Sequence, residues 1–184
     1  MTVGRIFVAV AMPDEARHAL AHHLETSLGD PSMPGRPAPP DNWHITLRFL
    51  GNAEQLAYEK LLGGLDQADL GPRFRLRLGG LGAFPRADRA SVLWVGTETG
   101  TVELVHLAAT VEECVADAGF MPEERPFHPH LTLSRIRPHE NVSDVIEDVA
   151  PARVAWDVGD VVVYRSHLGG GPARYEELER IDLG

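Results

Sequence analysis

The chain has 184 residues, the length of one compact domain or of two small lobes that share a core. Hydrophobic residues make up 43% and charged residues 24%, which excludes wholesale disorder. No apolar run approaches the roughly 20 residues of a membrane span. The first residues have the pattern of a strand and lack the basic start and small-residue cleavage site of a signal peptide. Cys114 is the single cysteine, which excludes an internal disulfide framework and suits a reducing cytoplasm, where we expect this protein.

The formal net charge is −10, from 17 basic and 27 acidic residues. This balance argues against a protein that coats nucleic acid nonspecifically, because such binding depends on many Lys and Arg contacts to phosphates. It leaves room for a local basic cleft, since the distribution of charge matters more than its sum.

In the first half of the chain, alternation and helical spacing predict three strands and two helices. The first helix begins after Pro13 with two acidic residues, carries an apolar face and ends at Gly29. A stretch rich in Pro and Gly follows it and is typical of an exposed loop. The predicted order is strand 4–11, helix 14–28, loop 30–40, strand 43–50, helix 54–68 and strand 74–78, with glycines loosening the chain after it.

The second half continues the same mixture. A long amphipathic helix is predicted between two strands, and three consecutive glycines indicate a hairpin loop near the end. The predicted order is strand 91–95, helix 101–118, strand 128–135, helix 142–149, strands 154–157 and 160–166, hairpin loop 169–171, and a last segment 174–181 that fits a strand or a helix. Interspersed elements with hairpin connections favour an α+β fold with mainly antiparallel sheets.

Two of the predicted strands carry the same pattern, His-x-Thr-Leu, almost half the chain apart. Strict alternation places His44, Thr46 and Arg48 on one face, and Ile45, Leu47 and Phe49 on the other. It likewise places His130, Thr132 and Ser134 opposite Leu131 and Leu133. The repeat suggests a duplicated lobe. If the two strands lie side by side, two imidazoles and two hydroxyls converge in one cleft.

Such a cleft suits phosphodiester hydrolysis without a metal. One imidazole can accept a proton from water while the other protonates the leaving oxygen, because His titrates near neutrality. Thr46 and Thr132 can donate hydrogen bonds to phosphoryl oxygens, and Arg48 can neutralise charge on the phosphate. A single His-x-Thr on a strand is usually structural, so the repetition is what points to chemistry.

Five segments extend the argument: RIFVAVAMP, NWHITLRFLG, GAFPRADRASVLWVG, RPFHPHLTLSRIR and VVVYRSHL. In this order they resemble the bacterial and archaeal RNA 2′,3′-cyclic phosphodiesterase family, historically called 2′-5′ RNA ligases, of the two-histidine phosphoesterase superfamily. The resemblance spans nearly the whole chain. It implies a single domain, residues 1–184, with two pseudo-symmetric lobes around a central cleft. Each lobe would hold an antiparallel sheet flanked by helices.

The resemblance also implies roles for residues. His44 would donate a proton to the leaving oxygen, His130 would activate water, and Thr46 and Thr132 would contact the phosphate. It places Arg48 and Arg135 near the phosphates, although Arg135 needs a twist or bulge after Thr132 to reach that face. The strand that carries Tyr164 and Ser166 would border the cleft, and these two residues complete the expected substrate-binding set.

The implied reaction is hydrolysis of RNA 2′,3′-cyclic phosphate ends to 2′-phosphate ends, with 2′-5′ ligation as a minor activity. We expect a monomer that needs no cofactor or metal, binds RNA ends, accepts nucleotides as further ligands, and does not bind membranes. Two alternatives remain open at this point. One is an RNA-end or nucleotide binding module without turnover, and the other is a metal-dependent hydrolase with His44, His128 and His130 as ligands.

Overall fold

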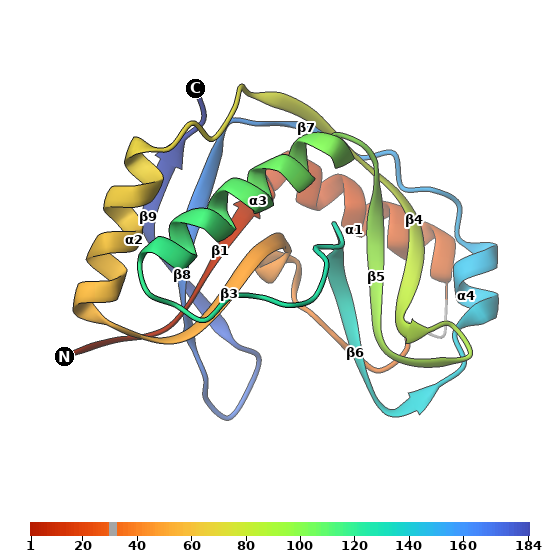
Figure 1. Cartoon of the computed structure of the whole chain (residues 1–184). Helices are drawn as coiled ribbons and strands as arrows, with labels where there is room; N and C mark the ends of the chain where they lie inside the picture. The colour runs from red at the N-terminus through yellow and green to blue at the C-terminus, as the bar shows by residue number, and fades with distance from the viewer. Residues whose placement is uncertain (30–32) are drawn as a thin grey trace.

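The computed structural model describes residues 1–29 and 33–184. The described chain forms two antiparallel sheets with helices around them (Figure 1). The elements are β1 (Thr2–Ala11), α1 (Asp14–Leu28), β2 (Arg36–Pro37), the 3₁₀ turn η1 (Pro40–Asn42), β3 (His44–Glu54), α2 (Gln55–Gln67), β4 (Phe74–Arg86), β5 (Arg89–Thr99), α3 (Thr101–Asp117), β6 (Leu131–Glu140), α4 (Ser143–Asp148), β7 (Ala155–Val158), β8 (Asp160–His167) and β9 (Arg174–Asp182). The expected α+β class with a sheet in each lobe is confirmed.

The first sheet has the strand order β3-β1-β8-β9, and the second has the order β2-β6-β5-β4-β7. The strand β3 is an edge of the first sheet and contacts β6, which lies next to the short edge strand β2 of the second. The two strands of the His-x-Thr repeat therefore meet where the two sheets adjoin. This is the juxtaposition that a shared site requires.

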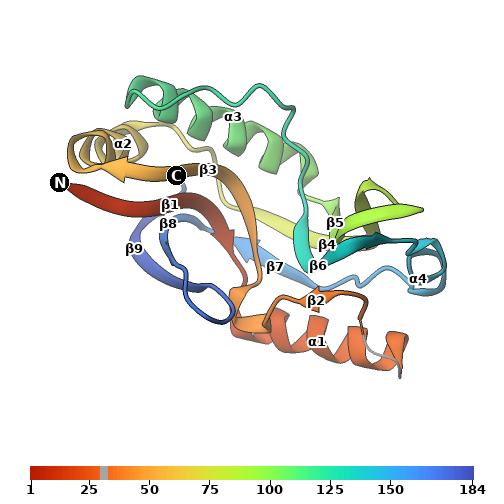
Figure 2. The same cartoon turned by 90° about the horizontal axis from the view of Figure 1, so that it is seen from below.

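The helices cover the sheets from two sides. Helices α2 and α3 lie next to each other on one side, and α1 lies on the other (Figure 2). Leu104, Leu107 and Val111 of α3 are buried at helical spacing, and each such side chain contributes about 1.5–3 kcal/mol by leaving water. Among the described residues, no helix is long and apolar enough to cross a membrane.

Several predicted elements are longer or shorter in the structure. The strand β4 continues to Arg86 instead of ending at 78, because its glycines stay in the strand. At Gly82 a Cβ would overlap the Trp94 ring, so glycine leaves the room that the indole needs. The predicted loop 30–40 contains β2 in its described part, while residues 30–32 lie outside the described residues. The last segment is a strand, β9, paired with β8.

Candidate active site

His44 stands at the first position of β3, two residues after the last residue of the turn η1. Its Nδ1 lies 2.7 Å from the carbonyl oxygen of Asn42. A carbonyl only accepts hydrogen bonds, so Nδ1 carries the proton and Nε2 of the neutral ring is free of one. The Thr46 hydroxyl lies 2.9 Å from Nε2 and donates to it. The backbone therefore fixes the tautomer, and Nε2 is the atom available for proton transfer.

His130 is held in the same way, one residue before β6 begins. Its Nδ1 lies 2.7 Å from the carbonyl oxygen of His128, two residues upstream, as Asn42 is upstream of His44. The half-buried Thr132 follows two residues later on β6, pairing with Trp94 of β5. Each lobe thus presents one imidazole with its Nδ1 proton bound to the backbone and Nε2 left for chemistry.

Aromatic rings surround both imidazoles. The centroid of the His44 ring lies 4.9 Å from that of Phe7 and 5.2 Å from that of Tyr175, which is nearly perpendicular to it. The His130 ring lies 4.9 Å from Phe84, also nearly perpendicular, and its next aromatic neighbour is Trp94 at 6.1 Å. These rings restrict water and hold both imidazoles at fixed angles.

The same burial sets the charge of the two histidines. The pKa of His44 is lowered to about 4, mainly by burial and also by the nearby charges of His130 and Arg135, against the opposing hydrogen bond to the Asn42 carbonyl. Burial also lowers the pKa of His130. The charges of His128 and Arg135 lower it as well, against the opposing hydrogen bond to the His128 carbonyl. Both imidazoles are therefore neutral at pH 7 in the free protein. The charge of His130 acts on His44 and that of Arg135 acts on both histidines, so the three side chains lie close enough to interact electrostatically.

The lowered pKa of His44 predicts a pH-dependent stability. An unfolded His titrates near 6.5, so folding favours its neutral form. The resulting stabilisation is complete above pH 6.5 and is lost as the pH falls from 6.5 to 4. Urea unfolding should show that wild type loses about 3 kcal/mol more than His44→Gln between pH 7 and pH 4. The exposed His18 supplies the control, because His18→Gln should behave like wild type. Equal losses in wild type and His44→Gln would contradict this prediction.

Arg135 reaches the site because β6 contains a bulge. Thr132 pairs with Trp94 and Ser134 pairs with Leu93, which leaves Leu133 as an extra residue. Leu133 and Ser134 are both fully buried, and the Ser134 hydroxyl donates a hydrogen bond to the carbonyl of Pro34. Arg135 follows as an exposed residue, and its charge lowers the pKa of both His44 and His130, so it lies near them. The expected bulge after Thr132 is confirmed.

A bulge at the same place in β3 corrects two expectations. Thr46 pairs with Ala9 and Arg48 pairs with Val8, so Leu47 is the extra residue. The expectation that Arg48 shares a face with His44 is wrong. Its Nε lies 2.5 Å from Glu112 of α3, and the guanidinium also donates to the carbonyl of Met121. Arg48 therefore ties β3 to α3 and to the segment after it.

Phe49 is the second correction. Strict alternation assigns it to the core, but its side chain is 52% exposed. It pairs with Phe7, and the two ring centroids lie 5.2 Å apart. Phe49 therefore extends the aromatic surface around His44.

The remaining expected residues lie on β8. Tyr164 stacks on Phe7 at 5.3 Å, and its ring lies 6.3 Å from that of His44. Ser166 pairs with Arg5 and with Tyr175. Tyr175 and Phe7 were missed by sequence reasoning. Reading 174–181 as a strand would have placed Tyr175 on a definite face, but its acidic residues hid that pattern.

The metal-dependent alternative needs a cluster of ligands. Among residues 1–29 and 33–184, no three His, Cys, Asp or Glu side chains form a group that could hold a metal ion. His128 lies against Trp94 with ring centroids 4.9 Å apart. The His128 and His130 rings are 6.2 Å apart.

Comparison with known proteins gives consistent matches. The family model of the 2′-5′ RNA ligase superfamily matches residues 12–170. A protein of Aeropyrum pernix named RNA 2′,3′-cyclic phosphodiesterase is 38% identical over 141 residues, 76% of either chain. The Escherichia coli protein of that name is 32% identical over 181 residues, covering 96% of this chain and 94% of its own.

The fold comparison agrees with the sequence comparison. The solved structure of Escherichia coli LigT with 3′-AMP has a TM-score of 0.80 and 29% identity, covering 98% of both chains. The structure of TT0787 from Thermus thermophilus has a TM-score of 0.74 and 31% identity, covering 97% of both chains. The similarity therefore extends over both lobes.

Proposed function

This chain belongs to the 2′-5′ RNA ligase superfamily, and we propose how it acts as an RNA 2′,3′-cyclic phosphodiesterase. His44 and His130 exchange protons on opposite sides of the phosphorus of a terminal cyclic phosphate. The observation that carries this mechanism is the matched tethering of the two imidazoles, each with Nδ1 bonded to the carbonyl two residues upstream and Nε2 left unprotonated.

The reaction is one in-line displacement. Nε2 of His130 accepts a proton from water as the water oxygen bonds to phosphorus. The bond from phosphorus to O3′ breaks, and O3′ takes the proton from Nε2 of protonated His44. The products are a free 3′-hydroxyl and a 2′-phosphate. Afterwards His130 releases its proton and His44 regains one, which restores the starting state.

His44 must hold a proton when substrate is bound, although its pKa is about 4 in the free protein. A bound phosphodiester supplies a negative charge next to the ring, which favours the charged imidazolium. Nε2 then becomes a donor and no longer accepts from Thr46. The Thr46 hydroxyl is released to donate to a phosphoryl oxygen, and Thr132 does the same from the other lobe. Arg135 balances the negative charge of the phosphate.

The exposed ring of Phe49 supports a place for the terminal nucleobase. Bases stack on aromatic side chains in a sequence-tolerant way. Phe49 lies against Phe7, which in turn lies against His44, so a base on Phe49 keeps its phosphate close to the imidazoles. Tyr164 and Ser166 border the same face and complete the proposed substrate contacts.

The substrate is a single RNA end, with nucleotides as further ligands of the same cleft. The solved complex of LigT with 3′-AMP supports nucleotide binding by this family. We infer that residues 1–184 act as one bilobal domain and as a monomer in the cytoplasm. The described chain itself supplies both histidines, both threonines and Arg135, and its single cysteine suits a reducing compartment.

The product of a dinucleotide with a 2′,3′-cyclic phosphate end tests this function. Phosphorus NMR should show conversion to the 2′-phosphate isomer, and turnover should persist in excess EDTA, because two imidazoles replace a Lewis acid. Binding without turnover would favour the RNA-end binding module. Loss of turnover in EDTA, with recovery of turnover on added zinc or manganese, would favour a metal-dependent hydrolase. A product that is mainly 3′-phosphate would reverse the orientation of the ribose but keep the two-histidine mechanism.

A further inference from the structure

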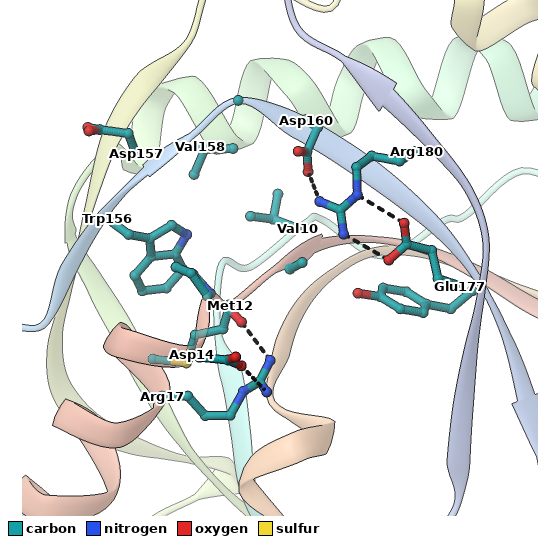
Figure 3. A pocket seen from close by; sticks show the side chains of 14 residues that line it. Val10, Met12, Asp14, Arg17, Trp156, Asp157, Val158, Asp160, Glu177 and Arg180 are labelled. Carbon is teal, nitrogen blue, oxygen red and sulfur yellow. Dashed lines mark hydrogen bonds and ion pairs between the residues drawn. The ribbon is translucent and has the colours of Figure 1, made fainter.

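A cavity of about 430 Å³ is lined in part by Tyr164, whose ring centroid lies 6.3 Å from that of His44. The end of β1, the start of α1, the link from β7 to β8, and β9 enclose it (Figure 3). Its volume is within the range of about 300–1,000 Å³ that ligand sites occupy. Tyr164 belongs both to this cavity and to the aromatic surface around His44, so the cavity begins one side chain away from the catalytic ring.

The wall of this cavity presents fixed acceptors. Both carboxylate oxygens of Glu177 accept from Arg180, at 2.9 and 2.8 Å, and Asp160 accepts from the same guanidinium at 2.8 Å. Each oxygen keeps a further lone pair, and Arg180 holds the carboxylates in place. The lining has four acidic side chains and two arginines, so it disfavours a phosphate (Asp14, Asp157, Asp160 and Glu177; Arg17 and Arg180).

The opposite wall presents a donor in need of a partner. Trp156 is only 6% exposed, and its indole N–H has no hydrogen-bond partner within the described residues. Figure 3 shows this nitrogen turned toward the cavity. A buried N–H without an acceptor costs about 1–3 kcal/mol, so an acceptor at this place is favoured. The cavity therefore offers a donor on one side and carboxylates on the other, which suits a neutral ligand with both kinds of group.

We propose that this cavity binds the nucleobase that precedes the cyclic-phosphate nucleotide, and that it prefers a base with an exocyclic amino group. A base is flat and neutral and carries donors and acceptors along its edge. Carboxylates accept hydrogen bonds from the amino group of cytosine. Uracil has a carbonyl at that place, which the carboxylates repel. The inference rests on the proposed function, because the histidines hold the cyclic end one side chain away.

Two dinucleotides and one mononucleotide test the proposal. All end in uridine 2′,3′-cyclic phosphate, and the dinucleotides carry cytidine or uridine before it. Wild type should have a kcat/KM about tenfold higher for the cytidine dinucleotide than for the uridine one. Glu177→Gln should bring that ratio close to one, because the amide adds a donor that faces the amino group. Asp160→Asn should lower the ratio in the same direction.

Glu179→Gln is the matched control. It makes the same change on the same strand, but Glu179 pairs with buried Val163 and acts on Tyr58 of α2, on the other face of the sheet. It should keep the wild-type ratio. A wild-type ratio of one, or a ratio unchanged by Glu177→Gln, would overturn the proposal. The carboxylates would then serve only to bind Arg180 and so connect β8 with β9. Wild-type turnover of the mononucleotide tests the proposed function separately, so the two failures are distinguishable.

Discussion

Replacing either motif histidine with alanine should reduce turnover of a cyclic-ended dinucleotide by at least about 10²–10⁴-fold. His44 and His130 each present Nε2 as the one atom free for proton transfer, since Nδ1 is bonded to the backbone. Removing one ring therefore removes either the base or the acid of a displacement that needs both. The loss should appear in kcat, because the proton moves in the transition state.

The variants must be shown to be folded, because both rings pack against aromatic side chains. Circular dichroism and unfolding at pH 7 check this. His18 and His22 are both exposed on α1. The variants His18→Ala and His22→Ala should therefore keep the wild-type rate. A folded His130→Ala protein with near-normal turnover would refute the pairing. A double variant should lose little more than one single variant, because the two groups act in one step.

The repeat itself could be predicted from the sequence, and so could the class of fold. Alternation in WHITLRFL and HPHLTLSR placed His and Thr on one face, and the structure confirms that β3 and β6 meet. Helical spacing likewise predicted α1, α2 and α3. These features depend on local patterns of apolar residues, which a sequence displays directly.

The bulges could not be predicted in the same way. Both follow the motif histidine by three residues, at Leu47 and Leu133, and each shifts the rest of its strand by one position. The fifth residue after each histidine is then exposed near the imidazoles. It is Phe49 in one lobe and Arg135 in the other. Strict alternation assigned both to the wrong face, because a bulge depends on the partner strand and leaves no fixed residue signature.

Aromatic neighbours were missed for a related reason. Phe7 is almost fully buried, yet it faces His44 and not the helices. A buried phenylalanine on a strand has the same pattern whether it packs in the main core or under a site. Trp94 and Phe84 around His130 share this ambiguity. Only the pairing of strands distinguishes the two sides.

The two arginines that sequence reasoning grouped together should respond differently to the same change. Arg135→Gln should lower kcat/KM by about 10²-fold, the usual loss when one positioned donor to a developing charge is removed. Arg48→Gln should leave kcat/KM close to wild type and should instead destabilise the fold by about 2 kcal/mol. Arg48 loses its bond to Glu112, whereas Arg135 loses the phosphate.

The pH profile separates these roles further. Burial is the main cause of the lowered pKa of both His44 and His130, and the charge of Arg135 is a further cause for each. Removing that charge raises both values, so the bell-shaped profile of kcat/KM should move to higher pH in Arg135→Gln. Arg48→Gln should keep the wild-type profile, because Arg48 faces α3. The placement of Arg48 toward α3 and of Arg135 near the histidines would be contradicted by either of two results. One is an Arg135→Gln profile at the wild-type pH, and the other is a comparable loss of kcat/KM in Arg48→Gln.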